Sequence, residues 1–400
     1  MPGVSSRVSG LVVPPFDALN QRAAELRRHG HDIINLGQAV PGFGPPAAAV
    51  EAARLALNEA ATHRYSADAG LLTLREALCD TFATERSIEA RPDDIIITAG
   101  GNQAFMLAAM TLIDPGDDVV LAAPYFVNHE MAIRAVGATP IEAPLQASTG
   151  FSARWADIAG HITSRTRAVV LCTPSNPTGA VAGGDELARI VGELADRGIL
   201  LLSDETYRHF VYDAVHASAA SVEGWRRTVV VVGTFSKSFG MTGWRAGYLL
   251  ADPGVCSQAI KIQDAMIICA PVISQIAVEA AVRDNWNYAR SFHDELRARR
   301  TALEEGLALI PRLEWSPAPG GFFAFVRVDG CLDSVALADE VLDRVHVVTI
   351  PGSTFGSSGE GFLRLSYGAS SVAELTEACA RLRSFFSSEA APQTIEAPPR

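Results

Sequence analysis

The chain has 400 residues, more than one hydrophobic core usually supports, so its length predicts two unequal domains. Apolar residues make up 48% of the chain and charged residues 20%, which is ordinary for a folded soluble protein. The net charge of −12 argues against a nucleic-acid or anionic-membrane surface, because such partners require clustered positive charge.

The six cysteines form no CxxC pair, and none lies near a histidine at metal-ligand spacing. They predict neither a disulfide framework nor a zinc site, and we expect no metal. The apolar stretch near the N-terminus is short and is interrupted by Pro14 and Pro15, unlike a signal peptide. No window is long and apolar enough to span a bilayer, so a cytoplasmic location is the default expectation.

Short apolar runs alternate with helical patterns through the middle of the chain. The expected strands are Ile95–Thr98, Val119–Ala122, Ala168–Cys172, Ile199–Ser203 and Val229–Gly233. The expected helices include Asn102–Leu112, Asn128–Val136 and Asp185–Arg197. This order predicts a mostly parallel sheet that helices cover on both faces, with its ligand beyond the carboxyl ends of the strands.

The pattern changes from about Pro271 onwards. One long helical pattern runs through residues 273–310, and strand-like segments follow at 313–328, 345–352 and 362–368. An amphipathic helix is expected over Val372–Phe386. The order predicts a second, smaller α+β domain hinged on the long helix, and the Pro-, Ala- and Glu-rich residues 387–400 are expected to be a disordered tail.

Polar residues follow several of the expected strands. Gly100 and Gly101 open a helix, where backbone N–H groups can approach a phosphate, although most such turns are only turns. Asn176 lies in a loop that two prolines make rigid; its amide can donate to a ring oxygen or form an Asx turn. Asp204 ends a buried strand and needs a cationic partner, which a protonated pyridine nitrogen or an arginine of the next helix could supply.

Lysine occurs only twice, at Lys237 and Lys261. Lysine, unlike arginine, can lose its proton and form an imine, although a genome that favours arginine codons would also leave few lysines. Thr234 and Ser236 precede Lys237 and Arg245 follows it, a set that can close around a phosphate and place the amine over a cofactor aldehyde. Lys261 has no such neighbours and is expected on a solvated helix face.

Together these motifs resemble the class I/II aminotransferases, which are fold type I pyridoxal-5′-phosphate (PLP) enzymes. The motifs recur in the family's order and spacing from about residue 37 to residue 368. The matching residues are Tyr65, Gly70, Leu74, Arg75, Gly100–Gln103, Asn176–Gly179, Asp204, Tyr207, Ser236, Lys237, Gly243–Arg245, Gly247 and Arg364–Ser366. The resemblance implies an α/β fold: a large domain with a mostly parallel sheet covered by helices, and a smaller α+β domain.

By this resemblance, the chain is expected to move the amino group of an L-amino acid to a 2-oxo acid. Lys237 would hold PLP as a Schiff base and would then carry a proton at the substrate Cα, with pyridoxamine phosphate as the intermediate. Asp204 would pair with the pyridinium nitrogen, and Asn176 and Tyr207 would hydrogen-bond the phenolic oxygen, lowering the pKa of the imine.

The family's pattern assigns further contacts to the cofactor. Phe126 would stack on its ring, or simply pack in the core. His129 falls where aspartate aminotransferases place a partner for the aspartate, or on a helix surface. The phosphate would be held by Arg245, Thr234, Ser236 and the turn at Gly101, Asn102 and Gln103. Tyr65 would reach the phosphate of the neighbouring subunit, which implies a homodimer with shared active sites.

The substrate contacts also come from the resemblance. Arg364 would clamp the α-carboxylate, helped by Asn176 and by the backbone at Gly37. Residues 35–43 are similar to the kynurenine/glutamine/methionine aminotransferase branch. Asn102 stands where prokaryotic aspartate enzymes often carry a basic residue, which argues against a dicarboxylate preference.

The resemblance also orders the chain into domains. Residues 1–45 would form an N-terminal segment that packs with the small domain and the dimer partner, residues 46–285 the large PLP-binding domain, and residues 286–386 the small domain. Three aromatic residues of the small domain could line an apolar pocket or pack in the core: Phe322, Phe323 and Phe355.

The sequence leaves three alternative functions to be weighed against amino-group transfer. A β-lyase or a related elimination enzyme would use the same lysine on the same scaffold. A non-catalytic PLP-binding regulator would need a DNA-binding domain, for which the N-terminal segment has neither room nor basic charge. A nicotinamide oxidoreductase would need a GxGxxG motif after the first strand, which is absent.

Overall fold

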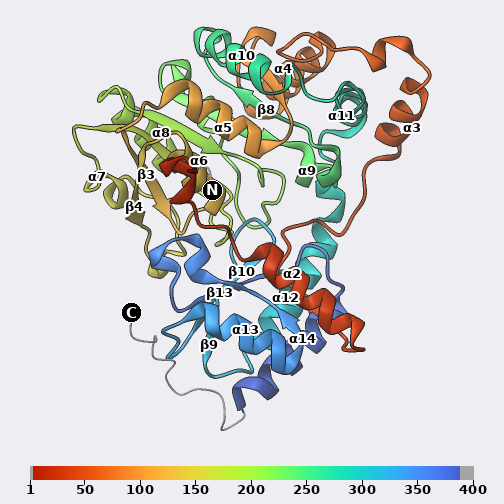
Figure 1. Cartoon of the computed structure of the whole chain (residues 1–400), viewed down its shortest axis with the longest axis vertical. Helices are drawn as coiled ribbons and strands as arrows, with labels where there is room; N and C mark the ends of the chain where they lie inside the picture. The colour runs from red at the N-terminus through yellow and green to blue at the C-terminus, as the bar shows by residue number, and fades with distance from the viewer. Residues whose placement is uncertain (1–2, 388–400) are drawn as a thin grey trace.

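Two sheets of different size organise the computed structural model, which describes residues 3–387 (Figure 1). The larger sheet has seven strands, and its central strands are rich in Val, Leu and Ala. In sheet order the strands are β2 (Ile95–Thr98), β8 (Gly247–Leu250), β7 (Val229–Thr234), β6 (Leu200–Asp204), β5 (Thr166–Cys172), β3 (Asp118–Ala123) and β4 (Thr139–Pro144). The strands from β7 to β4 are parallel, and β8 runs antiparallel to both of its neighbours. The expected α/β fold is confirmed.

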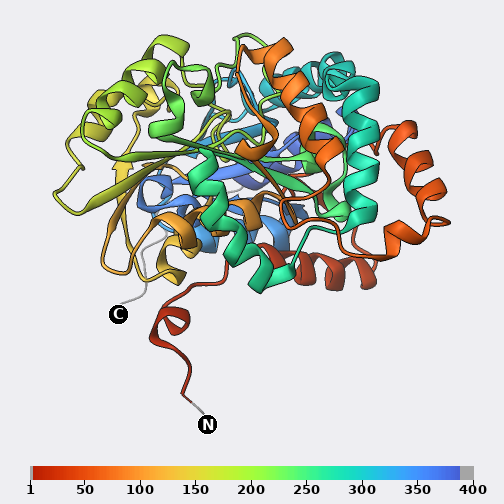
Figure 2. The same cartoon turned by 90° about the horizontal axis from the view of Figure 1, so that it is seen from above.

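Helices cover both faces of this sheet, which is why its central strands are apolar on both sides (Figure 2). One face packs against α5 (Gly101–Leu112), α6 (Val127–Ala135) and α10 (Pro253–Ile267). The other packs against α4 (Leu72–Arg86), α8 (Gly184–Ala195) and α11 (Val272–Asn285). Three further helices of this part are α3 (Ala47–Ala56), α7 (Trp155–Ala159) and α9 (Phe235–Ser238).

The prediction of a single long helix over residues 273–310 is wrong, because this stretch forms two helices. Helix α11 ends at Asn285, a 3-10 turn spans Tyr288–Phe292, and α12 runs over His293–Leu307. At the break, the side chain of Asn285 accepts a hydrogen bond from the backbone N–H of Asn287, a local bond that competes with the helical one.

The smaller part contains a four-stranded antiparallel sheet with the order β12 (Ile350–Pro351), β13 (Phe362–Ser366), β10 (Phe323–Val328) and β9 (Leu313–Glu314). Helices α12, α13 (Ser334–Val345) and α14 (Val372–Ser387) supply the rest of its core. Apart from Ser387, which ends α14, the tail expected over residues 387–400 lies outside the described residues. No helix within residues 3–387 has the length and apolar character needed to cross a membrane.

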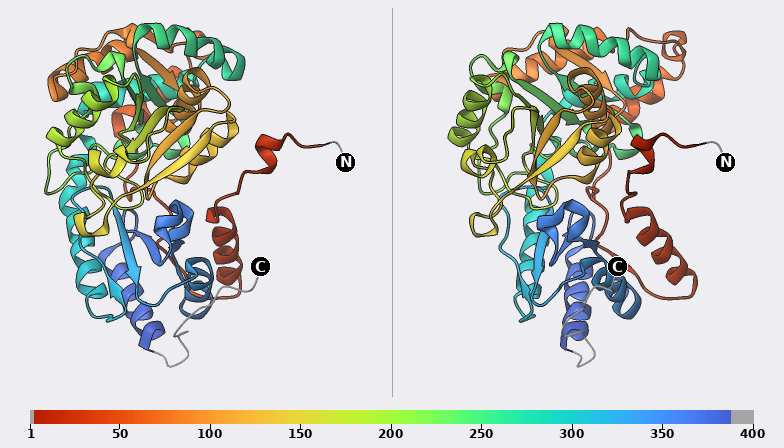
Figure 3. Two further views of the ribbon diagram at one scale, coloured as in Figure 1. Left: turned by 90° about the vertical axis from the view of Figure 1, so that its left-hand side faces the viewer. Right: turned by 60° about the vertical axis from the view of Figure 1, so that its left-hand side comes forward.

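The N-terminal region lies against the smaller part. Strand β1 (Ile34–Asn35) pairs in parallel with β11 (Val347–Val348), and α2 (Phe16–Arg28) packs beside it (Figure 3). Arg22 of α2 forms an ion pair of 2.6 Å with Asp343 of α13. In the segment before α2, the short helix α1 (Ser6–Ser9) lies close to α6.

Candidate active site

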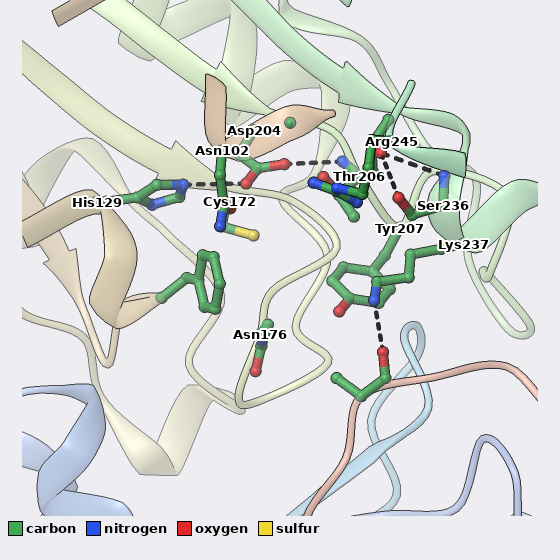
Figure 4. A pocket seen from close by; sticks show the side chains of 14 residues that line it. Asn102, His129, Cys172, Asn176, Asp204, Thr206, Tyr207, Ser236, Lys237 and Arg245 are labelled. Atoms are coloured by element: carbon green, nitrogen blue, oxygen red, sulfur yellow. Dashed lines mark hydrogen bonds and ion pairs between the residues drawn. The ribbon is translucent and has the colours of Figure 1, made fainter. Parts of the chain in front are cut away.

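A cavity of about 190 Å³ lies at the carboxyl ends of the parallel strands. Asp204 is the last residue of β6, and Asn176 follows β5 in the loop before α8. Lys237 lies in α9, directly after β7. Because adjacent parallel strands end at the same edge of a sheet, these separate loops meet around one space (Figure 4).

One end of the cavity is suited to an anion. Gly101 and Asn102 begin α5, whose first backbone N–H groups have no partner within the helix. Thr234 and Ser236 are buried beside them, with their hydroxyl oxygens 2.9 Å apart. Four N–H or O–H donor groups therefore converge beside the guanidinium of Arg245.

Arg245 lies at the exposed rim of this end. Its guanidinium donates 2.8 Å and 3.3 Å hydrogen bonds to the carbonyl oxygens of Thr242 and Ala99. Its backbone is in the left-handed region at φ 51°, which is unfavourable for a residue with a Cβ and is found mostly where function requires it. Gly100 also has a positive φ of 89°, and a Cβ there would collide with the Arg245 guanidinium.

Lys237 projects into the middle of the cavity. Its Nζ donates a 2.6 Å hydrogen bond to the carbonyl oxygen of Ala39, which lies after β1 (Figure 4). Burial, followed by the positive charges of Arg364 and Arg245, lowers the pKa of Lys237 from 10.5 to about 8. About a tenth of this amine is therefore neutral, and nucleophilic, at pH 7, far more than for an ordinary lysine.

Asp204 lines the cavity, and two hydrogen bonds hold its carboxylate in place. Its Oδ2 accepts a 3.0 Å hydrogen bond from Nε2 of His129, and its Oδ1 accepts one of 2.9 Å from the backbone of Thr206. Burial raises the pKa of Asp204, but the bonds from His129 and Thr206 outweigh this and hold it below its usual range. The carboxylate is thus charged although it is buried, and its partner is a histidine rather than an arginine of the next helix.

His129 is a buried residue and does not lie on a helix surface; only 2% of it is exposed. Its ring stacks on Phe105 at 4.2 Å and meets Phe126 edge-on at 5.4 Å. Phe126 and Tyr207 both line the cavity, and edge-on contacts with Phe322 and Phe323 fix the ring of Tyr207. The cavity that Asp204 lines therefore also has an aromatic ring and a phenol in its wall.

Arg364 approaches from the smaller sheet. It lies in β13 between Leu363 and Leu365, whose side chains enter the core on the other face, and it is 1% exposed. Its Nη1 donates a 2.9 Å hydrogen bond to Oδ1 of Asn176, and Nη2 donates to the carbonyl oxygen of Gly37. Its Nε is buried without a hydrogen-bond partner among residues 3–387, which leaves it free for a ligand carboxylate.

Four predicted site residues do not line this cavity, and two of them, Arg364 and Gly37, are joined to each other by the hydrogen bond described above. Gln103 turns back, and its side-chain oxygen accepts a hydrogen bond from the backbone of Ala99, so it closes the turn before α5. Tyr65 is 76% exposed and lies away from the cavity of its own chain. The aromatic residues proposed as alternative pocket or core residues are fully buried in the core: Phe322, Phe323 and Phe355.

Three lining residues were not identified from the sequence. Ala39 contributes a backbone carbonyl, which no side-chain pattern can reveal. Cys172 is the last residue of β5, and Thr206 lies two residues after the end of β6. Both therefore lie at the carboxyl end of a strand, as the identified residues do. This position at the end of a strand was the sequence feature that could have identified Cys172 and Thr206.

Comparison with known proteins matches the chain to a family. Residues 31–382 match the family model for aminotransferase class I and II. A probable aspartate/prephenate aminotransferase of Aquifex aeolicus is 34% identical, over 95% of this chain and 98% of that protein. An aromatic-amino-acid aminotransferase of Thermococcus litoralis is also 34% identical, over 88% and 90%. The structure of Thermus thermophilus aspartate aminotransferase with maleate superposes with a TM-score of 0.90 at 32% identity, covering 96% of this chain and all of that one.

These relatives support the aspartate branch of the family and a transaminase activity, and none of them supports elimination or a regulatory role. The family model spans most of the chain, and the relatives are matched over nearly their whole length. The chain therefore belongs to the class I and II aminotransferase family.

Proposed function

We propose that this transaminase uses PLP, held as a Schiff base by Lys237, to move the amino group of an L-amino acid to a 2-oxo acid. One observation carries the proposal. A single cavity joins an amine of lowered pKa, a charged buried carboxylate and an anion-binding end. These are the three groups that a phosphorylated pyridine aldehyde requires.

The residues present fit that cofactor. The cluster around Arg245 would hold the phosphate through the backbone of Gly101 and Asn102 and the hydroxyls of Thr234 and Ser236. Asp204, at the closed end of the cavity, would meet the ring nitrogen. When bound, the protonated ring acts as an electron sink for the substrate Cα.

The remaining residues would orient the ring and the substrate. Phe126 would cover one face of the ring, and Tyr207 and the amide nitrogen of Asn176 would donate to its phenolic oxygen. Arg364 would bind the substrate α-carboxylate with its guanidinium, together with Asn176 and the backbone at Gly37. Lys237, released from the cofactor, would then remove the proton from the substrate Cα.

We also propose a homodimer with shared active sites. The exposure of Tyr65 supports this, because Tyr65 does not line the active-site cavity of its own chain and would reach the phosphate of the partner subunit. The proposed domains are residues 46–285 and 286–386. The pairing of β1 with β11 supports the proposal that the N-terminal segment, residues 1–45, packs with the small domain. A cytoplasmic location stays a prediction, with which the six unpaired cysteines agree.

Borohydride reduction followed by peptide mapping tests the proposed function directly. The label should be found on the peptide that contains Lys237. The visible absorbance of the purified protein should decrease with some amino donors and return with 2-oxo acids, which distinguishes transamination from elimination. A label elsewhere, or release of ammonia in place of a returning absorbance, would contradict the proposal.

The rate at which PLP reacts with the apoenzyme is expected to rise with pH and to level off above about pH 8. Below the lowered pKa of Lys237 the amine is protonated, so the rate should fall about tenfold for each pH unit. The return of the visible absorbance after PLP is added, followed at each pH, measures this rate. A rate that still climbs steeply near an ordinary lysine pKa of about 10.4 would show that the amine is not perturbed.

A further inference from the structure

A second cavity, of about 370 Å³, adjoins the first. The two share Phe126, Asn176, Lys237 and Ala39, and Arg364 lies in the wall of the second alone. The second cavity therefore begins where the reacting amine and the carboxylate-binding guanidinium meet. It extends from there towards α2 and the smaller sheet.

This position assigns the cavity to the substrate side chain, an assignment that rests on the proposed function. If Arg364 holds the α-carboxylate and Lys237 reaches the Cα, then the third substituent of the Cα points into the remaining space. The lining of this cavity is therefore what distinguishes one amino acid from another.

Most of that lining is apolar. Phe16 and Leu19 project from α2, Val40 follows β1, and Val348 and Ile350 come from the smaller sheet. Leu19, Val348 and Ile350 are buried, so this wall is a continuation of a packed core. Such a wall gains from contact with a substrate hydrocarbon and offers a desolvated charge no counter-ion. The other polar side chains of the lining that are not assigned to the reacting end, Asn20, Gln38 and Asn128, are uncharged amides.

Asp17 is the one acidic residue in the lining. The cations in that lining, Lys237 and Arg364, are both assigned to the reacting end of the substrate. Asp17 lies in the first turn of α2, where a carboxylate also complements the helix dipole, and no cation within residues 3–387 forms an ion pair with it.

The helix that carries Asp17 is held in place. Asn20 accepts a 3.1 Å hydrogen bond from Asn35, whose own side-chain oxygen accepts one of 2.9 Å from the backbone of Gly37. The ion pair between Arg22 and Asp343 fixes the middle of α2 to α13. The position of Asp17 on the helix is thus fixed, and because Asp17 is exposed, its carboxylate places a negative charge at the entrance of the cavity.

We propose that the second cavity selects amino acids with uncharged, apolar side chains, and that Asp17 disfavours dicarboxylic substrates. A side-chain carboxylate would lose its hydration against the apolar wall and would meet a like charge at the entrance. An aromatic or branched aliphatic side chain fills the same space without either penalty.

The test compares half-reactions of the PLP-loaded enzyme with L-phenylalanine, L-leucine, L-aspartate and L-glutamate, each followed by the loss of visible absorbance. We expect kcat/KM for phenylalanine or leucine to exceed that for either dicarboxylate by at least about tenfold. Higher values for aspartate or glutamate would overturn this inference and leave transamination intact. If no amino acid changed the absorbance, the proposed function itself would fail, and this inference with it.

Two variants separate the charge from the apolar wall. Asp17→Asn should raise kcat/KM for aspartate about three- to tenfold, by an amount that shrinks with added salt, while the value for phenylalanine stays within about twofold. Glu25→Gln, which removes a carboxylate from the exposed side of the same helix, is the matched control and should change neither value.

Phe16→Ala should lower kcat/KM for leucine by about tenfold or more and that for alanine much less, because alanine does not reach the wall. Equal losses for leucine and alanine, or an Asp17→Asn enzyme with the original aspartate value, would contradict the assignment.

Discussion

Replacement of Lys237 by alanine is expected to abolish transamination, with kcat lowered by at least about a thousandfold. The amine has a lowered pKa and projects into the middle of the cavity, and we propose it both for the covalent bond to PLP and for the proton transfer. Steady-state rates with a saturating amino donor and 2-oxo acid measure the loss. The absorbance spectrum should also lose the band of the protein-bound cofactor.

The chain contains its own control for this experiment. Lys261 is the other lysine; it lies on the exposed side of α10 and donates a 2.5 Å hydrogen bond to Gln258. Lys261→Ala should keep its rate within about twofold, since surface substitutions of this kind change little. Comparable losses from the two variants would mean that the site is assigned to the wrong lysine.

Substitution of Asp204 is expected to slow proton abstraction from the substrate by at least about a thousandfold, in both Asp204→Ala and the isosteric Asp204→Asn. The negative charge at this position would stabilise the protonated ring nitrogen, and without it the electrons released at the Cα would lose their sink. Exchange of the substrate α-hydrogen with solvent, measured in single turnovers, isolates this step.

The Asp204→Asn variant separates the effect of losing the negative charge from the effect of disturbing the fold. Asparagine has the shape of aspartate and can still accept the backbone hydrogen bond from Thr206, so the fold and the space for the cofactor should survive. A normal absorbance spectrum after PLP is added would show that the cofactor still binds. An Asp204→Asn enzyme that exchanges the α-hydrogen at nearly the original rate would show that the charge has no catalytic role.

Much of the site could be predicted because its residues follow strands directly. Asp204 ends β6, Lys237 comes just after β7, and Gly101 begins the helix after β2. Apolar runs locate the strands from local sequence alone, and parallel pairing then brings the carboxyl ends of neighbouring strands together. No long-range contact had to be known in advance to group these residues.

Some strands were missed for local reasons. Strand β4 carries two prolines and a glutamate at the sheet edge, where one side of the strand meets solvent, so it shows no continuous apolar run. Strand β8 has four residues and follows the Arg245 loop directly. Its antiparallel pairing with β2 and β7 comes from its neighbours, which local sequence does not specify.

The sequence by itself determined the α/β sheet, the order of its loops and the candidate lysine, because each depends on a pattern within about ten residues. Only the tertiary structure decided that His129 supports Asp204, that Arg364 reaches Asn176 from a second sheet, and that the helical stretch breaks after Asn285. It also decided which apolar side chains of α2 and the smaller sheet share one cavity with Asp17. These outcomes depend on contacts between residues far apart in the chain, and such contacts are set by how whole elements pack.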